Sequence, residues 1–259
     1  MKYILLFLCL TAISVRAQNT IPATFIKDTT LSKQQIVDID NFGTQYSIQQ
    51  NVFYKKSNTK SSNYSNVQLG EITSANAFNT LKINVFYKDF NTAIILDNRL
   101  AEIFKIDFNT TKPYKSVSLI STGNDNTLWI FNQDIQQLEV YDYKINKTRA
   151  TTLPVQSAVL DLKSNFNFCW LLTENYLYKY NYFGSLTQKI KNEGFTAIEE
   201  DNGNLVLKKE NSLYFLQKNT EQFLEIKIPN LLINQFLLTN ETLYICQEKT
   251  LSKFQLKIK

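Results

Sequence analysis

Carboxylates are the side chains of this sequence that could do chemistry. Asp38, Asp40, Asp161 and Glu199 lie in or beside short apolar runs. Oxygen ligands of this kind suit Ca²⁺ or Mg²⁺, neither of which requires histidine. The chain contains no histidine, which excludes the usual general base and every serine–histidine or cysteine–histidine nucleophile pair. We therefore assign no catalytic residue, and these four carboxylates are the candidate metal ligands, with Ca²⁺ or Mg²⁺ as the cofactor they would hold.

The cysteines offer little further chemistry. Cys169 and Cys246 both lie within apolar runs, where cysteine behaves as a small hydrophobic residue. They also belong to different copies of the repeat described below, so their Cα atoms are expected to lie too far apart for a disulfide. Both thiols are predicted to be buried and unbridged.

Composition and charge describe an ordinary folded chain. The 259 residues are 44% hydrophobic and include 6 glycines and 4 prolines, which excludes disordered and collagen-like classes. The formal net charge is +5, and it falls to +3 when Lys2 and Arg16 are removed with the N-terminal segment. This charge is too small to indicate a nucleic-acid partner.

The first 17 residues have the pattern of a secretory signal peptide. A basic start is followed by the apolar run 4–15 and by Val15-Arg16-Ala17, a small-x-small cleavage pattern. The apolar run is too short to cross a bilayer, and no second candidate follows, so we expect no transmembrane segment. The expected mature domain is 18–259. It would reside in the periplasm or at the outer membrane, with release outside the cell as the alternative.

A repeat of nearly forty residues organises the mature chain. A polar or acidic turn followed by leucine recurs at Leu100, Leu138, Leu177, Leu213 and Leu251, with spacings of 38, 39, 36 and 38. A degenerate first copy lies at Val52, 48 residues before Leu100. An apolar run precedes each turn, and its hydrophobic residues are consecutive, which predicts strands covered on both faces. The 28 asparagines supply residues that tolerate tight turns where glycine is scarce.

Six repeats of about 40 residues, each with four short strands, are typical of propeller blades. The sequence therefore predicts an all-β, six-bladed β-propeller. The last copy, 231–259, has room for only three strands. We expect the run 23–27 to supply the fourth strand and to close the ring by pairing with that blade, which removes two exposed sheet edges. Seven blades, or five blades with an irregular piece, are the alternatives.

One segment disturbs the regular spacing. Residues 55–66 are rich in serine, asparagine and lysine, and they would account for the longer first copy. We interpret the segment as a solvated insertion, because it lacks the apolar area needed to order itself. The alternative is a contact loop whose three lysines meet an acidic partner or an anionic glycan.

Two stretches carry a resemblance to known repeats. The run 36–43 followed by 46–48 has the strand, Asp/Asn-x-Gly turn and strand order of NHL-like and two-component-regulator-like propellers, and 126–130 is similar to their second strand. The resemblance, which extends over about residues 20–259, implies a secreted bacterial β-propeller. It implies no active site, because these families share geometry and not a common chemistry.

The predicted ring places the carboxylates. The first strand of each blade would line a central channel, and Glu200 and Asp201 would join the four candidate ligands there. The leading hypothesis is a non-enzymatic secreted propeller that acts as a binding or assembly platform for a protein or glycan in the bacterial envelope. The alternative is a metal-dependent hydrolase or lactonase that uses the channel carboxylates. Between the two interpretations of the carboxylates we favour the one in which they simply face channel water and hold no cofactor, with bound Ca²⁺ or Mg²⁺ as the alternative. We expect a monomer.

Overall fold

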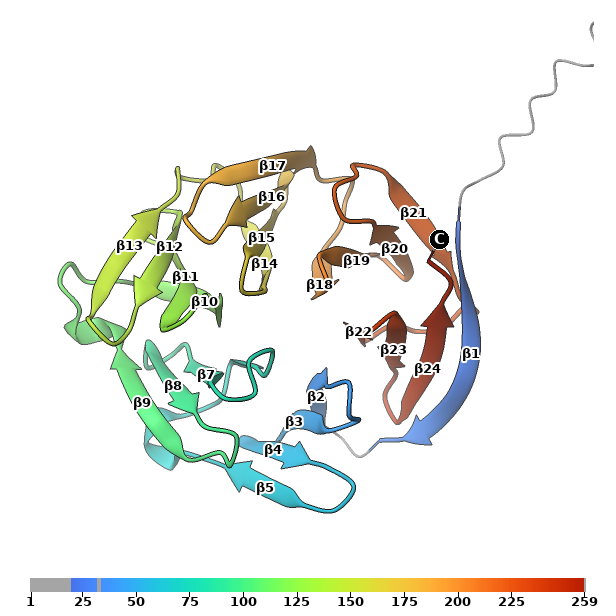
Figure 1. Cartoon of the computed structure of the whole chain (residues 1–259), viewed down its shortest axis with the longest axis horizontal. Coiled ribbons are helices and arrows are strands. Elements are labelled where there is room, and N and C mark those ends of the chain that lie inside the picture. The colour runs from blue at the N-terminus through green and yellow to red at the C-terminus, as the bar shows by residue number, and fades with distance from the viewer. Residues whose placement is uncertain (1–19, 32–33, 259) are drawn as a thin grey trace, which may run out of the picture.

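The computed structural model describes residues 20–31 and 34–258, and strands make up nearly all of its regular structure (Figure 1). Within this range the only helical pieces are two short 3-10 turns, η1 (Val67–Leu69) and η2 (Phe108–Thr110). The prediction of an all-β chain is confirmed. The predicted signal peptide, 1–17, lies outside the described residues. No helix in the described part of the chain is long and apolar enough to cross a membrane.

Four of the sheets have four antiparallel strands each, in sequence order from the centre outward. The first contains β2 (Gln35–Ile39), β3 (Gln45–Gln49), β4 (Val52–Lys56) and β5 (Ser61–Tyr64). The second contains β6 (Ser74–Asn76), β7 (Ile83–Tyr87), β8 (Thr92–Leu96) and β9 (Glu102–Asp107). The third contains β10 (Val117–Thr122), β11 (Thr127–Asn132), β12 (Gln137–Asp142) and β13 (Lys147–Thr151). The fourth contains β14 (Val159–Ser164), β15 (Phe168–Thr173), β16 (Tyr176–Asn181) and β17 (Leu186–Lys191).

The fifth sheet has eight strands, in the order β18-β19-β20-β21-β1-β24-β23-β22. Its members are β18 (Ala197–Asp201), β19 (Asn204–Lys209), β20 (Ser212–Leu216), β21 (Phe223–Lys227), β1 (Ile21–Thr30), β24 (Thr250–Leu256), β23 (Thr242–Cys246) and β22 (Gln235–Thr239). The N-terminal strand β1 therefore lies inside this sheet. It runs antiparallel to β24 and parallel to β21.

This topology corrects the predicted architecture. The propeller arrangement is present, but the prediction of six blades, in a ring closed by an N-terminal strand that pairs with the last blade, is wrong, because β1 pairs with β21 as well as with β24. The structure has four independent four-stranded blades and the eight-stranded sheet. The physical reason is the length of β1. It has ten residues where the run 23–27 was expected, and its first two, Ile21 and Pro22, pair with β21.

The early and late parts of the chain lie side by side. Phe25 is opposite Phe254 in the β1–β24 ladder, with ring centroids 5.6 Å apart. The Gln235 side chain bonds the backbone of Ile36, accepting from its N–H at 3.2 Å and donating to its carbonyl. Inner strands β2 and β22 are thus neighbours around the axis.

The core lies between neighbouring sheets. β7, β8 and β11 are buried along their whole length, because their apolar residues point into both adjoining interfaces. Trp129 of β11 contacts Tyr180 of the next sheet, with ring centroids 6.5 Å apart. The outer strands β13 and β17 alternate between exposed and half-buried residues. Stacked faces therefore explain the consecutive apolar residues of the inner strands.

Two expectations about the early repeats are wrong. Leu138, Leu177, Leu213 and Leu251 belong to third or equivalent strands, whereas Leu100 lies in the turn after β8. The second copy was thus placed one strand too late. The segment 55–66 is also not an insertion, because it contains the end of β4 and all of β5. The 48-residue gap reflects the misplaced copy.

Candidate functional site

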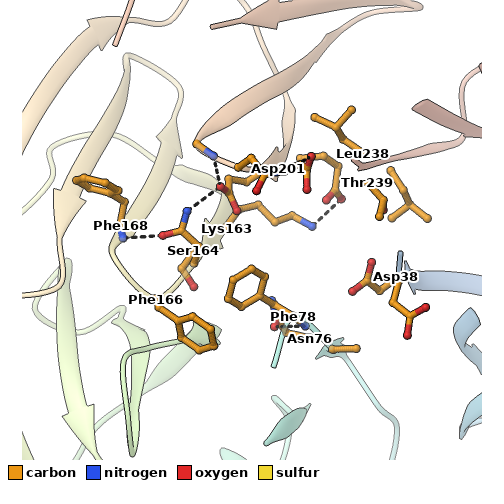
Figure 2. A pocket seen from close by; sticks show the side chains of 18 of the residues that line it. Asp38, Asn76, Phe78, Lys163, Ser164, Phe166, Phe168, Asp201, Leu238 and Thr239 are labelled. Carbon is orange, nitrogen blue, oxygen red and sulfur yellow. Dashed lines mark hydrogen bonds and ion pairs between the residues drawn. The ribbon is translucent and has the colours of Figure 1, made fainter. Parts of the chain in front are cut away.

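The site is a cavity of about 500 Å³ at one end of the ring axis, called here the axial cavity (Figure 2). Four of the turns that join a first strand to a second strand converge on it. Their lining residues are Asp40 and Asn41 after β2, Phe78 and Thr80 after β6, Asn165 to Asn167 after β14, and Asn202 and Gly203 after β18. The strands themselves supply the deeper side chains, including Asp38, Lys163 and Glu199.

An ion pair lies on the wall of the axial cavity. Lys163 Nζ on β14 donates to Glu199 Oε1 on β18 at 2.6 Å. Asp161 lies two residues before Lys163 on the same strand face, and its Oδ2 accepts from the Ile198 N–H at 2.9 Å. These bonds connect two neighbouring inner strands. Lys163 was not among the predicted site residues, although its alternation with Asp161 was a usable signal.

Burial and charge act in opposite directions on this pair. Burial raises the pKa of Glu199 to about 7, although the ammonium of Lys163 counteracts the shift. Burial alone would lower the pKa of Lys163, but the carboxylates of Glu199, Asp161 and Asp38 raise it above its ordinary value. Lys163 is therefore charged at neutral pH and is the positive centre of this acidic group.

Asp38 feels the charge of Lys163, which lowers its pKa, but within the described residues it forms no ion-pair contact of its own. Its Oδ1 accepts from the N–H of the adjacent Ile39 at 2.7 Å, and no Lys or Arg in the described chain forms an ion pair with it. Burial raises its pKa to about 6. Asp40, by contrast, organises the β2–β3 turn, because its Oδ1 accepts from the N–H groups of Phe42 and Thr44.

Glu200 and Asn165 form a second polar group on the wall. Asn165 Nδ2 donates to Glu200 Oε1 at 2.7 Å, and the Gly203 N–H donates to the same oxygen at 2.8 Å. Asn165 Oδ1 also accepts from the N–H of Phe168. Burial raises the pKa of Glu200, and it raises that of the nearby Asp201 as well. The group fixes the β14–β15 turn against β18.

Two phenylalanines flank the opening. The rings of Phe78 and Phe166 meet edge to face with centroids 4.9 Å apart, and both are partly exposed (Figure 2). They come from the β6–β7 and β14–β15 turns. Phe168 also lines the cavity, and Lys179 Nζ lies 4.2 Å from its ring centroid. Sequence reasoning did not single out these aromatic residues, because their two turns meet only in the folded ring.

The structure brings three of the four predicted metal ligands to one cavity without grouping them around one point. Asp38, Asp40 and Glu199 line the axial cavity, whereas Asp161 is engaged by backbone N–H groups beside it. Residues 20–31 and 34–258 contain no group of three Asp, Glu, His or Cys residues placed to hold a metal ion. The ammonium of Lys163 already supplies positive charge to Glu199, Asp161 and Asp38. The assignment of Ca²⁺ or Mg²⁺ to these carboxylates stays a prediction.

The two thiols are remote from this chemistry. Cys169 and Cys246 are both buried and free, as predicted. Burial raises the pKa of Cys246 to about 12 and also raises that of Cys169. Neither is a thiolate at neutral pH, so neither is an activated nucleophile.

No protein-family model matches the sequence, and no curated protein matches it significantly. Solved structures do resemble the fold. A catalytically inactive virginiamycin B lyase from Staphylococcus aureus with quinupristin has a TM-score of 0.63 at 14% identity, over 94% of this chain and 97% of the lyase. A streptogramin B lyase has a TM-score of 0.63 at 12% identity, over 95% of this chain and 96% of the lyase. A chain of the mitotic checkpoint complex has a TM-score of 0.60 at 11% identity, over 93% of this chain and 94% of that one. At these identities the likeness supports the propeller fold alone.

Proposed function

We propose that this protein is a non-enzymatic binding and assembly platform of the bacterial envelope, and that the axial cavity with its aromatic opening is its contact site for a protein or glycan. The observation that carries the proposal is the convergence of four turns, from separate parts of the chain, on one open cavity with partly exposed rings. Partly exposed aromatic rings on rigid turns are well suited to contact, because they bury apolar area at low entropic cost.

The chemistry of the site favours binding over catalysis. The inactive S. aureus lyase carries alanine in place of a histidine, and the present chain has no histidine that could take such a role. Glu199, one of the candidate metal ligands, is engaged by Lys163. The metal-dependent hydrolase is accordingly not favoured.

The location and oligomeric state belong to the same proposal. A leader over residues 1–17 would direct the domain 18–259 to the periplasm or the outer-membrane surface. The domain would act there as a monomer. The partner would then meet the turns around the axial cavity, where Phe78 and Phe166 are partly exposed.

Affinity capture from the native envelope tests the proposal. The double variant Phe78→Ala/Phe166→Ala would remove the aromatic opening. The matched control, Phe90→Ala/Ile135→Ala, changes two similarly exposed residues in the β7–β8 and β11–β12 turns, at the opposite ends of the strands. We expect wild type and control to capture the same partner and the double variant to lose it. Equal capture by all three proteins would refute the assignment of the site.

A further inference from the structure

We propose that the axial cavity binds a basic side chain, lysine or arginine, from a segment of a partner protein, with the aliphatic stem lying against Phe78 and Phe166. This inference rests on the proposed function and names the chemistry of its partner. Three features of the described residues carry it: the charge of the lining, the unpaired carboxylate of Asp38 and the geometry of the opening.

The lining is acidic in a basic protein. Five carboxylates face two ammonium groups, a formal net charge of −3, whereas the whole chain carries +5. The acidic members are Asp38, Asp40, Glu199, Glu200 and Asp201, and the basic members are Lys163 and Lys218. A concave site lined by one sign of charge attracts ligands of the other sign. A cationic ligand therefore fits this site better than an anionic one.

Asp38 is the least engaged of the five lining carboxylates. Lys163 is already paired with Glu199, and the Asp40 oxygen is engaged by the β2–β3 turn. Asp38 accepts only from the N–H of its chain neighbour Ile39 within the described residues. An incoming ammonium or guanidinium group would give it the charge-assisted hydrogen bonds that such groups form with carboxylates.

The opening suits a cation on an apolar stem better than a free ion. Phe78 and Phe166 present ring surface beside the polar lining (Figure 2). Lysine and arginine lay their methylene groups along apolar surface while the charged end reaches a polar partner. A lysine next to the lining already contacts one of its rings through its ammonium group, because Lys179 Nζ lies 4.2 Å from the centroid of Phe168 and 5.5 Å from that of Trp170. A small metal ion would leave the aromatic pair unused.

Ligand-detected saturation-transfer NMR tests the proposal with three short probes. They are Ac-Gly-Lys-Gly-NH₂, the same peptide with norleucine, which keeps the stem and lacks the charge, and the same peptide with glutamate. We expect transfer to the lysine side chain and at least tenfold weaker binding of the other two. Equal binding of the norleucine peptide, or no binding of the lysine peptide, would overturn the proposal.

Variants locate the binding. Asp38→Asn should weaken binding of the lysine peptide about tenfold, because this is the usual effect of losing one charged hydrogen-bond partner. Phe78→Ala/Phe166→Ala should weaken both the lysine and the norleucine peptides. Asp89→Asn, an exposed carboxylate between β7 and β8, is the matched control and should bind as wild type does. Unchanged binding by Asp38→Asn would overturn the inference.

The outcomes separate this inference from the proposed function. If envelope capture depends on Phe78 and Phe166 but the lysine peptide does not bind, the platform stands and the cationic partner is wrong. If a neutral oligosaccharide binds in the axial cavity and the lysine peptide does not, the partner is a glycan and the cationic partner is wrong. If neither capture nor peptide binding depends on these residues, both proposals fail.

Discussion

Lys163 Nζ lies 2.6 Å from Glu199 Oε1, and the pair joins the inner strands of two neighbouring sheets, β14 and β18. Asp161 strengthens the same junction through the N–H of Ile198. The axial cavity is therefore bounded by a rigid polar wall. A binding site needs such a wall, because side chains held in place lose little freedom when a ligand arrives.

Lys163→Met should destabilise the fold in a pH-dependent way. The substitution leaves the largely buried Glu199 carboxylate without its partner, at a cost of about 2 kcal/mol, below that of a fully buried pair because both side chains keep some exposure. The loss should be greater at pH 8 than at pH 5, because Glu199, with a pKa of about 7, is protonated at pH 5. Urea unfolding at the two pH values measures this, with the exposed Lys218→Met as control. An equal loss at both values would contradict it.

The raised pKa values predict that the protein loses stability as pH rises. The pKa of Asp38 is raised by burial from 3.8 to about 6, so between these values the unfolded chain has released a proton that the folded chain retains. Its contribution is favourable at low pH and is lost as pH rises from about 4 to about 6. Between pH 4 and 8, the free energy of unfolding should fall by about 2–3 kcal/mol less in Asp38→Asn than in the wild-type protein. Denaturant midpoints from pH 4 to 8 measure it.

Two further variants check which carboxylates cause this pH dependence. Asp40 and Asp201 also raise the pKa of Asp38, whereas Lys163 lowers it. Glu199→Gln should flatten the pH dependence in the range up to about pH 7. Glu193→Gln, an exposed carboxylate after β17, should leave the curve unchanged. If the stability of the wild-type protein rises steadily from pH 4 to 7, Asp38 and Glu199 do not govern its pH dependence.

Phe254→Ala should be among the most damaging substitutions. The ring is 1% exposed and packs against Phe25 of β1. Deleting a fully buried phenylalanine costs about 3–5 kcal/mol through lost burial and the remaining cavity. Phe42→Ala, at a ring that is 92% exposed, should change the free energy of unfolding by less than about 0.5 kcal/mol. Similar values for the two variants would refute the placement of β24 against β1.

Two glycines near the first-to-second-strand turns should differ in their tolerance of alanine. A Cβ at Gly123 would lie 2.7 Å from the Thr127 carbonyl oxygen, which is too close without a backbone shift. A Cβ at Gly43 would meet nothing within 4 Å, but that residue has φ +79°. We expect Gly43→Ala to cost about 1 kcal/mol and Gly123→Ala about 2–3 kcal/mol. Thermal unfolding of both variants measures the difference, and the reverse order would contradict it.

Local sequence pattern predicted the buried strands well. The consecutive apolar residues of 93–96 and 128–131 required cover on both faces, and both runs are buried between sheets. The pattern missed β6, because Ser74, Ala75 and Asn76 contain no apolar run. It also gave no sign that β1 would extend to β21, since that pairing depends on backbone hydrogen bonds between distant segments.

The candidate site was predictable only in part. Asp38 and Glu199 were expected on inner strands, and they line the axial cavity. Phe78, Phe166 and Asn165 could not be found in the same way, because they lie in turns of different sheets and become neighbours through the ring arrangement. Local alternation identifies which strand face a side chain occupies. It does not identify the residues from other sheets that share its cavity.

Site-specific photo-crosslinking tests the central claim most directly. A photo-reactive benzoylphenylalanine would replace Phe166 at the axial cavity in one protein and Phe90 at the opposite strand ends in another. After irradiation in the native envelope, mass spectrometry would identify the attached peptides. The account predicts one partner protein crosslinked at position 166, through a segment that contains lysine or arginine, and no such product at position 90. A partner crosslinked only at position 90, or a segment without a basic residue at position 166, would contradict it.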